Sequence, residues 1–263
     1  MVTVKDILTF IESIAPGYMK KEWDNVGLLC GNESQVVDKV LVALDPFEAV
    51  CQEATAWGAD LIVTHHPLIF QGLKSVTDHT ETGRCIKTLI ENKISAVNAH
   101  TNLDCAPGGV NDTLANALSL TDIHVINPTG VTESGKEWGL LRKGEVPPQT
   151  LPKFLENVKC ALGCQGLRYA NGGKPVHSVA VGGGSCGDEL FAVAAAGCDT
   201  FVTADVKYNQ FADAASMGIN IIDAGHFCTE NPIVAVLAEQ IQEKFPQILV
   251  KTSQVHKDCV NFY

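Results

Sequence analysis

The stretch that decides the fold is residues 39–67, "KVLVALDPFEAVCQEATAWGADLIVTHHP". Two short apolar runs, "KVLVAL" and "ADLIV", flank a segment in which apolar residues recur at helical spacing. A second helical pattern, "TGRCIKTLIENK", and a third apolar run, "ISAVNAH", follow. This alternation predicts a βαβαβ series and a mainly parallel sheet, because parallel strands need a crossover connection between them.

The second half of the chain shows the same alternation. Apolar runs such as "VHSVAVGGG" and "CDTFVTAD" alternate with helical patterns such as "KYNQFADAASMG", and a terminal helix begins near "NPIVAVLAEQIQEKF". Pro128, Gly130 and Gly135 interrupt the pattern between the halves. We therefore predict two related α/β domains, residues 1–127 and 128–263, with a terminal helix that could pack back on the first.

The composition narrows the class of protein. Nineteen basic and thirty acidic residues give a net charge of −11, which disfavours a broad nucleic-acid interface. The ten cysteines are scattered without C-x-x-C spacing, which favours free thiols in a reducing cytoplasm over disulfides. No apolar run approaches the roughly 20 residues of a membrane span. We expect a soluble cytoplasmic protein.

The two halves can be overlaid through their glycines. "WGADLIVTHHP" then lies over "AGCDTFVTADV", which pairs Gly58 with Gly197, Asp60 with Asp199, Thr64 with Thr203 and His66 with Asp205. The next strand ends also correspond, as "NAHTNLD" and "AGHFCTE". Both halves therefore place polar side chains at the carboxyl ends of equivalent strands, where open α/β sheets build their sites.

Six side chains at these strand ends form a candidate metal site: His65, His66, His100, Asp104, His226 and Glu230. Imidazole and carboxylate ligands suit zinc, manganese and iron. So many candidates suit two divalent ions about 3.5–4 Å apart in a cleft between the domains, with Glu230 as the bridge. The alternative is that each residue caps a helix or packs in a core, but the recurrence at equivalent positions favours the metal interpretation.

Three further features carry weaker predictions. "GGGSCGD" follows a strand and precedes a helix, so Gly183, Gly184 and Ser185 could bind a phosphate, although a tight turn explains the glycines equally well. His100 and Asp205 are candidates for a proton shuttle or for orienting a metal ligand. In "WDNVGLL", a structural role is favoured, with Trp23 packed and its polar neighbours shaping a turn.

Several motifs together resemble the NIF3-like family, whose members carry the name GTP cyclohydrolase I type 2: "EWDNVGLLCG", "VTHHPLIF", "AHTNLD", "VAVGGGSCGD" and "DAGHFCTE". The resemblance spans nearly the whole chain. It implies two related α/β domains, a toroidal homohexamer built from dimers, and a two-metal centre. The family's ligands then fall on His65, His66, Asp104, His226 and Glu230, without His100. The chain resembles the compact form, which lacks a middle insertion.

The resemblance also implies an activity, opening of the GTP imidazole ring with release of formate. Where many relatives have Thr-Gly-Asp and a following histidine, this chain has Ala204 and Asn209, so a role for that histidine cannot be carried over. Two alternatives stay open: a metal-dependent nucleotide or phosphoester hydrolase, and a metal carrier or regulatory protein without turnover.

Overall fold

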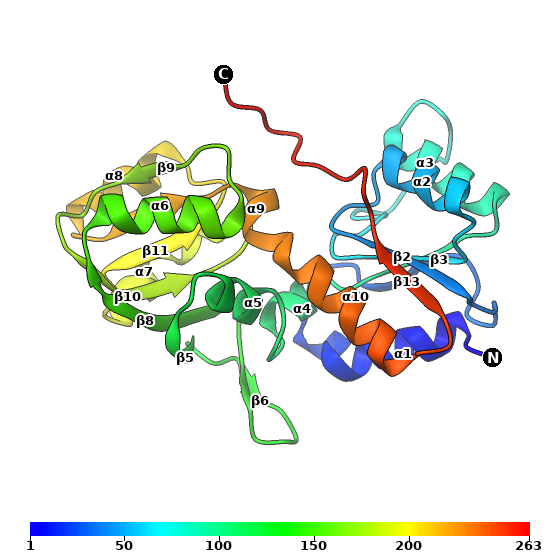
Figure 1. Ribbon diagram of the computed structural model, residues 1–263, viewed down its shortest axis with the longest axis horizontal. Helices are drawn as coiled ribbons and strands as arrows, with labels where there is room; N and C mark the ends of the chain where they lie inside the picture. The colour runs from blue at the N-terminus through cyan, green and yellow to red at the C-terminus, as the bar shows by residue number, and fades with distance from the viewer. The chain divides into compact units, whose positions relative to one another are not determined.

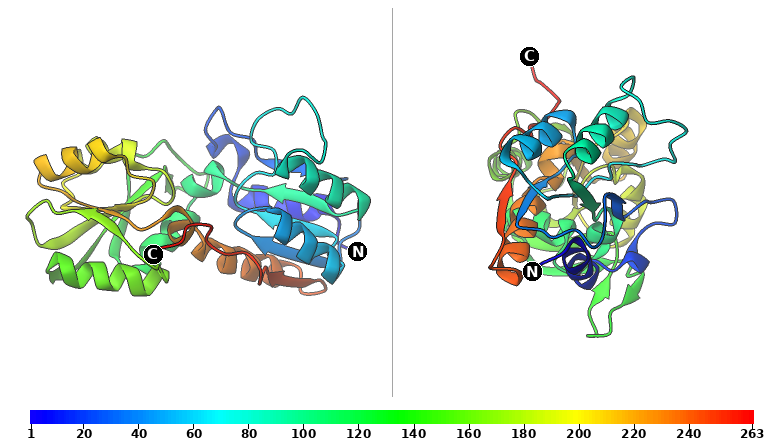
Figure 2. Two further views of the ribbon diagram at one scale, coloured as in Figure 1. Left: turned by 90° about the horizontal axis from the view of Figure 1, so that it is seen from above. Right: turned by 90° about the vertical axis from the view of Figure 1, so that its right-hand side faces the viewer.

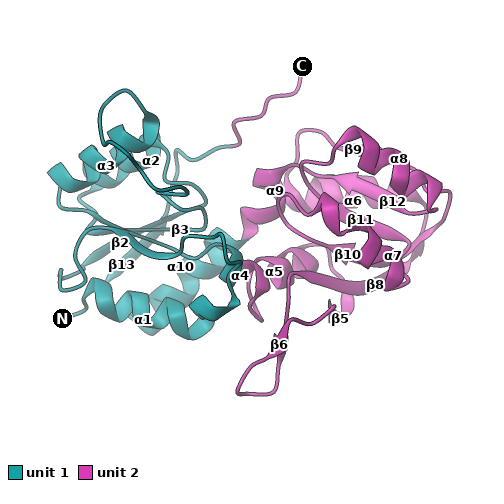
Figure 3. Cartoon of the chain, turned by 180° about the vertical axis from the view of Figure 1, so that it is seen from behind, with its two compact units in different colours: residues 1–103, 233–257 teal, residues 104–232, 258–263 magenta.

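The computed structural model describes residues 1–263 as two compact units (Figure 3). The first comprises residues 1–103 and 233–257, and the second comprises residues 104–232 and 258–263. The division lies earlier than the predicted boundary at residue 127. The glycines and proline of that region instead belong to a hairpin of the second unit, formed by β6 (Gly130–Val131) and β7 (Glu137–Trp138).

The first unit contains a five-stranded sheet in the order β1-β4-β3-β2-β13. Its strands are β1 (Gly27–Cys30), β2 (Lys39–Ala43), β3 (Leu61–Thr64), β4 (Ser95–Asn98) and β13 (Leu249–Thr252). All neighbours pair in parallel except β1, which runs antiparallel to β4. The mainly parallel sheet predicted from the alternation of residues 39–98 is therefore confirmed in this unit.

Helices cover both faces of this sheet, as Figures 1 and 2 show. On one face, α2 (Glu48–Trp57) and α3 (Glu81–Glu91) bury apolar side chains against β2, β3 and β4. On the other face lie α1 (Val4–Ile14) and α10 (Pro232–Lys244). The rings of Phe10 and Phe245 meet edge to face, with centroids 5.9 Å apart. The terminal helix thus belongs to the first unit, although the sequence places it after the second.

The second unit contains a six-stranded sheet in the order β5-β8-β10-β11-β12-β9. Its strands are β5 (Thr121–Ile126), β8 (Leu141–Gln149), β9 (Arg168–Ala170), β10 (Val176–Val181), β11 (Thr200–Thr203) and β12 (Asn220–Asp223). Only the central strands β10, β11 and β12 pair in parallel, and the others are antiparallel. This sheet is more mixed than the predicted one, because three strands outside the repeated βαβ series extend its edges.

Helices also lie on both faces of the second sheet (Figure 2). A buried apolar cluster joins α5 (Val110–Ala117) and α6 (Leu151–Leu162) to one face. Another joins α7 (Leu190–Ala195) and α8 (Tyr208–Ser216) to the opposite face. Two short helices, α4 (Thr101–Cys105) and α9 (His226–Glu230), and two 3₁₀ turns, residues 17–19 and 187–189, complete the chain. None of its helices has the length and apolar character needed to cross a bilayer.

The internal repeat is visible in matching local structure. Gly58 caps the end of α2, and Gly197 follows the end of α7. Their φ values are +69° and +77°, a left-handed conformation that glycine adopts without steric cost. The carboxylate of Asp60 then accepts hydrogen bonds from two backbone amides at the start of β2, and that of Asp199 does the same for β10. The overlay of the two halves is therefore confirmed at these positions.

Candidate metal centre

Three histidines gather at the carboxyl end of the sheet in the first unit. His65 and His66 directly follow β3, and His100 follows β4, the neighbouring parallel strand. Each offers one ring nitrogen, and these nitrogens lie within 4.8 Å of one another. Adjacent residues of a strand face opposite ways, but both His65 and His66 lie beyond the strand end, which lets their rings share one site.

Every ring in this cluster is oriented through its Nδ1 atom. His65 Nδ1 donates to the carbonyl of Ala99 at 2.9 Å. His66 Nδ1 lies 2.7 Å from Asp45 Oδ1, and His100 Nδ1 lies 2.8 Å from Asp24 Oδ1. An acceptor at Nδ1 favours the tautomer with its proton there, which presents the Nε2 lone pair as the metal-binding atom.

Asp24 is a buried carboxylate that anchors the loop carrying His100. It accepts hydrogen bonds from the His100 ring and from both the amide and the hydroxyl of Thr101. Burial alone would raise the pKa of Asp24, but these hydrogen bonds outweigh it and hold that pKa well below its usual range. Asp24 therefore stays ionised and favours a proton on His100 Nδ1.

Trp23 packs at the surface and not in a core, because the residue is 62% exposed. Its ring lies edge to face with the rings of Phe70 and His100, with centroid distances of 5.7 and 6.2 Å. The polar residues beside Trp23 join this motif to other parts of the first unit through hydrogen bonds. Asp24 holds His100, and Asn25 donates to the carbonyl of Ile69 at 2.6 Å.

The second unit builds a cluster of its own around Glu230. His226 and Glu230 begin and end α9, one helical turn apart, and His226 Nε2 lies 3.1 Å from Glu230 Oε2. The ligand oxygens of Asp104 and Glu230 lie within 4.8 Å of each other, and both residues are buried. His226 Nδ1 lies 2.6 Å from Asp205 Oδ2, so this ring, like those of the first unit, is oriented through Nδ1.

Asp104 is positioned by a buried arginine. The Arg142 guanidinium pairs with Asp112 through Nε at 2.6 Å and donates to the backbone carbonyls of Cys105 and Ala106. Arg142 is 1% exposed, so these carbonyls and the carboxylate replace the water that it loses on burial. Hydrogen bonds from Arg142 thereby join the two residues after Asp104 to β8. No sequence motif singled out this arginine.

The glycine-rich loop lies against Glu230. A Cβ atom at Gly184 would lie 2.1 Å from Glu230 Oε1 and 3.1 Å from His226 Nε2. The Gly183 amide donates to Asn111 Oδ1 and the Gly184 amide to Thr229 Oγ1, at 2.7 and 3.0 Å. These two amides are thus engaged within the chain and give no support to phosphate binding, and the role of Ser185 stays a prediction. The glycines instead give the Glu230 carboxylate room.

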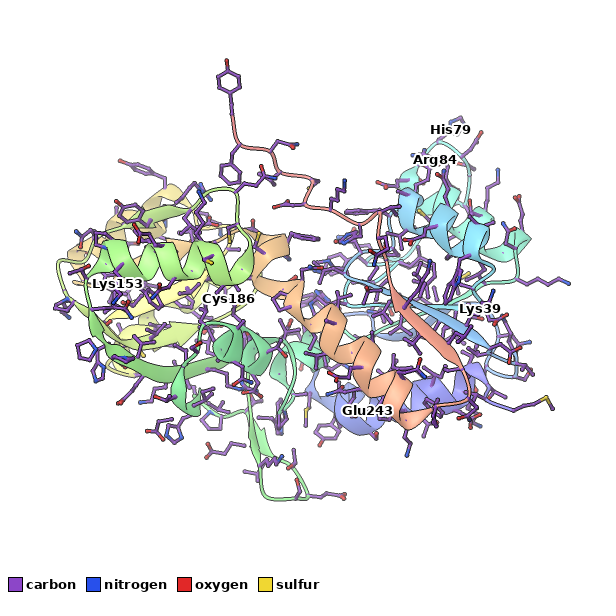
Figure 4. The ribbon with its side chains drawn as sticks, viewed as in Figure 1. Lys39, His79, Arg84, Lys153, Cys186 and Glu243 are labelled. Atoms are coloured by element: carbon purple, nitrogen blue, oxygen red, sulfur yellow. The ribbon has the colours of Figure 1, made fainter.

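The donor set of the second cluster fits a cation. Asp104 and Glu230 are two carboxylates buried close together, and like charges in such a place repel unless a cation lies near them. Burial, together with the charges of these two residues, raises the pKa of the Cys186 thiol well above its usual value. Cys186 lies inside the second unit (Figure 4). Oxygen and imidazole donors of this kind bind divalent zinc, manganese or iron.

The family model for Duf34/NIF3 (NGG1p interacting factor 3) matches residues 2–259. The chain belongs to this family. It is 37% identical over 243 residues to a GTP cyclohydrolase 1 type 2 homolog of Clostridium perfringens, with 92% of both chains covered. The GTP cyclohydrolase 1 type 2 of Helicobacter pylori is 29% identical over 239 residues and covers 91% of both chains.

The fold of the Duf34/NIF3 family agrees with the structure of this chain. A solved Bacillus cereus protein described as related to NIF3 superposes with a TM-score of 0.94 at 27% identity, covering 100% of this chain and 99% of that one. The resemblance drawn from the quoted motifs is thus confirmed over the full length.

The structure brings predicted residues together within each unit. His65 and His66 meet His100 in the first unit. In the second unit, His226 contacts Glu230 and Asp205, and Asp104 lies beside Glu230. Of the two departures from the family pattern, Ala204 is buried and Asn209 is exposed on α8. Sequence reasoning gave Asp24 a role in a turn and did not single out Asp45, although these carboxylates hold the His100 and His66 rings. Each lies far along the chain from the histidine that it contacts, so the spacing of the residues carried no signal.

Proposed function

We propose that this chain is a metal-dependent hydrolase with two divalent ions per chain. The proposed ligands are His65 and His66 in the first unit and Asp104, His226 and Glu230 in the second. One observation carries the proposal: each proposed histidine ligand has its Nδ1 within 2.9 Å of a carboxylate or carbonyl oxygen. Histidines that bind metals are almost always oriented in this way.

The reaction proposed is the GTP cyclohydrolase activity that the Helicobacter pylori relative is named for. The motif resemblance implies that it opens the imidazole ring and releases formate. When bound, divalent ions supply Lewis acidity and a nucleophilic water near neutral pH. Glu230 would contribute its carboxylate oxygens to hold such ions, and Asp205 keeps His226 in place through the 2.6 Å hydrogen bond.

His100 is proposed to move a proton. Asp24 holds the proton on His100 Nδ1, so the exchange with substrate would occur at Nε2. His100 is one of the three clustered histidines, and its side chain is 14% exposed to solvent. The same buried carboxylate stabilises the protonated ring that forms during transfer.

Metal content tests the ligand assignment. We expect elemental analysis to find up to two ions of zinc, manganese or iron per chain, and the double variant His65→Ala with His226→Ala to lose them while keeping its circular dichroism spectrum. His79→Ala is the matched control, because His79 is an exposed histidine in the loop before α3 (Figure 4). Retention of both ions in the double variant would show that the ligands are wrong.

A turnover screen tests the activity. Zinc-, manganese- and iron-loaded protein is incubated with GTP and other nucleotides, and formate and phosphate are both measured. Formate from GTP supports the proposal, and His100→Ala should lose at least about 100-fold in rate while keeping its metal. Phosphate alone would identify a phosphoester hydrolase. No product, together with ready transfer of metal to a chelating partner, would favour a carrier.

The assembly is proposed to be a homohexamer built from dimers, as the family resemblance implies. Six chains of 28.1 kDa would have a mass of about 169 kDa. Light scattering at micromolar concentration distinguishes this mass from that of a monomer. A monomer would remove the hexamer from the proposal without affecting the metal ligands.

A further inference from the structure

The carboxylate that orients His66 is shared with a second histidine from the far end of the chain. Asp45 Oδ1 lies 2.7 Å from His66 Nδ1, and Asp45 Oδ2 lies 2.9 Å from His256 Nε2. One carboxylate therefore joins an imidazole after β3 to an imidazole after β13. All three residues belong to the first unit.

His256 is enclosed in the unit. Its side chain is 4% exposed, and its ring packs against Phe47 with centroids 5.6 Å apart. A buried imidazole needs hydrogen-bond partners, and Asp45 supplies one. The Nε2 atom lies 2.9 Å from Asp45 Oδ2, so the carboxylate links His256 to the His66 ring.

The segment that carries His256 is fastened to α2. Glu53 accepts hydrogen bonds from the Ser253 hydroxyl at 2.5 Å and from the Gln254 amide at 3.1 Å. The His256 amide donates in turn to the Ser253 hydroxyl at 3.2 Å. The strand before this segment, β13, pairs in parallel with β2, which leads to Asp45. His256 thus reaches Asp45 from a fixed backbone.

We infer that His256 is a positioning residue for the metal site: it holds the Asp45 carboxylate so that the His66 ring keeps its Nδ1 proton and directs Nε2 to the ion. The inference rests on the proposed metal-binding function. A carboxylate held from one side only can rotate about its side-chain bonds. A donor on the other oxygen removes that freedom, and the geometry of His66 is then set before any ion binds.

The test compares substitutions at position 256 by metal affinity. Zinc is titrated into metal-free protein in competition with a chromogenic chelator. His256→Phe keeps a planar ring beside Phe47 but has no donor, and we expect it to weaken zinc binding by about 10–100-fold. His256→Gln offers an amide donor near the position of Nε2 and should retain most of the affinity. His79→Ala again serves as the control for loss of an exposed histidine.

A double-substitution cycle separates positioning from general structural damage. If His256 acts through the carboxylate, His256→Phe should cause no further loss of zinc affinity in an Asp45→Ala background. A merely structural role would lower affinity by the same factor in both backgrounds. Should His256→Phe fail to fold, His256→Gln against His256→Asn makes the same comparison, because the shorter amide cannot reach Asp45.

The outcomes distinguish this inference from the proposed function. Wild-type zinc affinity in His256→Phe, or an equal loss in both backgrounds, overturns the role of His256 and leaves the metal site standing. Failure of the wild-type protein to bind zinc, manganese or iron overturns both.

Discussion

Gly184→Ala is the substitution whose effect follows most directly from the structure. The new Cβ atom would lie 2.1 Å from Glu230 Oε1, so the carboxylate would have to retreat by about 1 Å to reach even a close contact of about 3 Å. Metal–ligand distances tolerate only about 0.2 Å. Glu230 therefore cannot keep the position in which it is proposed to bind metal.

The expected magnitude has two parts. Gly184 has a φ of +63°, and an alanine in this left-handed region costs about 1–2 kcal/mol of folding free energy. The displaced carboxylate adds a loss of metal binding, which we expect to exceed 100-fold because a ligand itself is moved and not only its support.

A matched control isolates the second part. Gly197 also has a positive φ, +77°, but a Cβ atom there would meet nothing within 4 Å. Gly197→Ala should therefore show a similar fall in unfolding free energy in urea with unchanged metal affinity. Both variants are compared by urea titration of the metal-free protein and by zinc competition. Equal zinc affinity in the two variants would refute the reasoning that places Glu230 in the site.

Three further predictions concern stability and thiol chemistry. Burial alone would raise the pKa of Glu53, but the hydrogen bonds from Ser253 and Gln254 outweigh it and lower that pKa. The ionised carboxylate therefore stabilises the folded state above its ordinary pKa, and this contribution is lost as pH falls. Glu53→Gln should lower the unfolding free energy in urea at pH 7 and much less at pH 3.5. Arg142→Met leaves the Asp112 carboxylate and four backbone carbonyls without their buried donor, and should cost about 3–5 kcal/mol in the same measurement. Cys160 and Cys259 are the exposed cysteines and should react rapidly with a disulfide reagent, the partly buried Cys30 should react more slowly, and the seven buried cysteines should react only on unfolding. More than three reactive thiols in the native protein would contradict the burial pattern.

The repeated α/β pattern could be read from the sequence because strand and helix periodicity are local properties. The runs around "KVLVAL" and "ADLIV" became β2 and β3, and the glycines after the helices marked equivalent turns at Gly58 and Gly197. The division into units could not be read in this way. Pro128 and Gly130 interrupt the pattern, but they belong to a hairpin, and the terminal helix joins the first unit through contacts that no local pattern encodes.

The candidate ligands also came from the sequence, since His65, His66 and His226 follow strands whose ends are predictable. The residues that orient them did not. Asp24 is 76 residues from His100, and His256 is 211 residues from Asp45. The pairing of β1 with β4 brings Asp24 to His100, and the pairing of β13 with β2 brings His256 to Asp45. A hydrogen bond depends on distance in space and leaves no spacing rule along the chain.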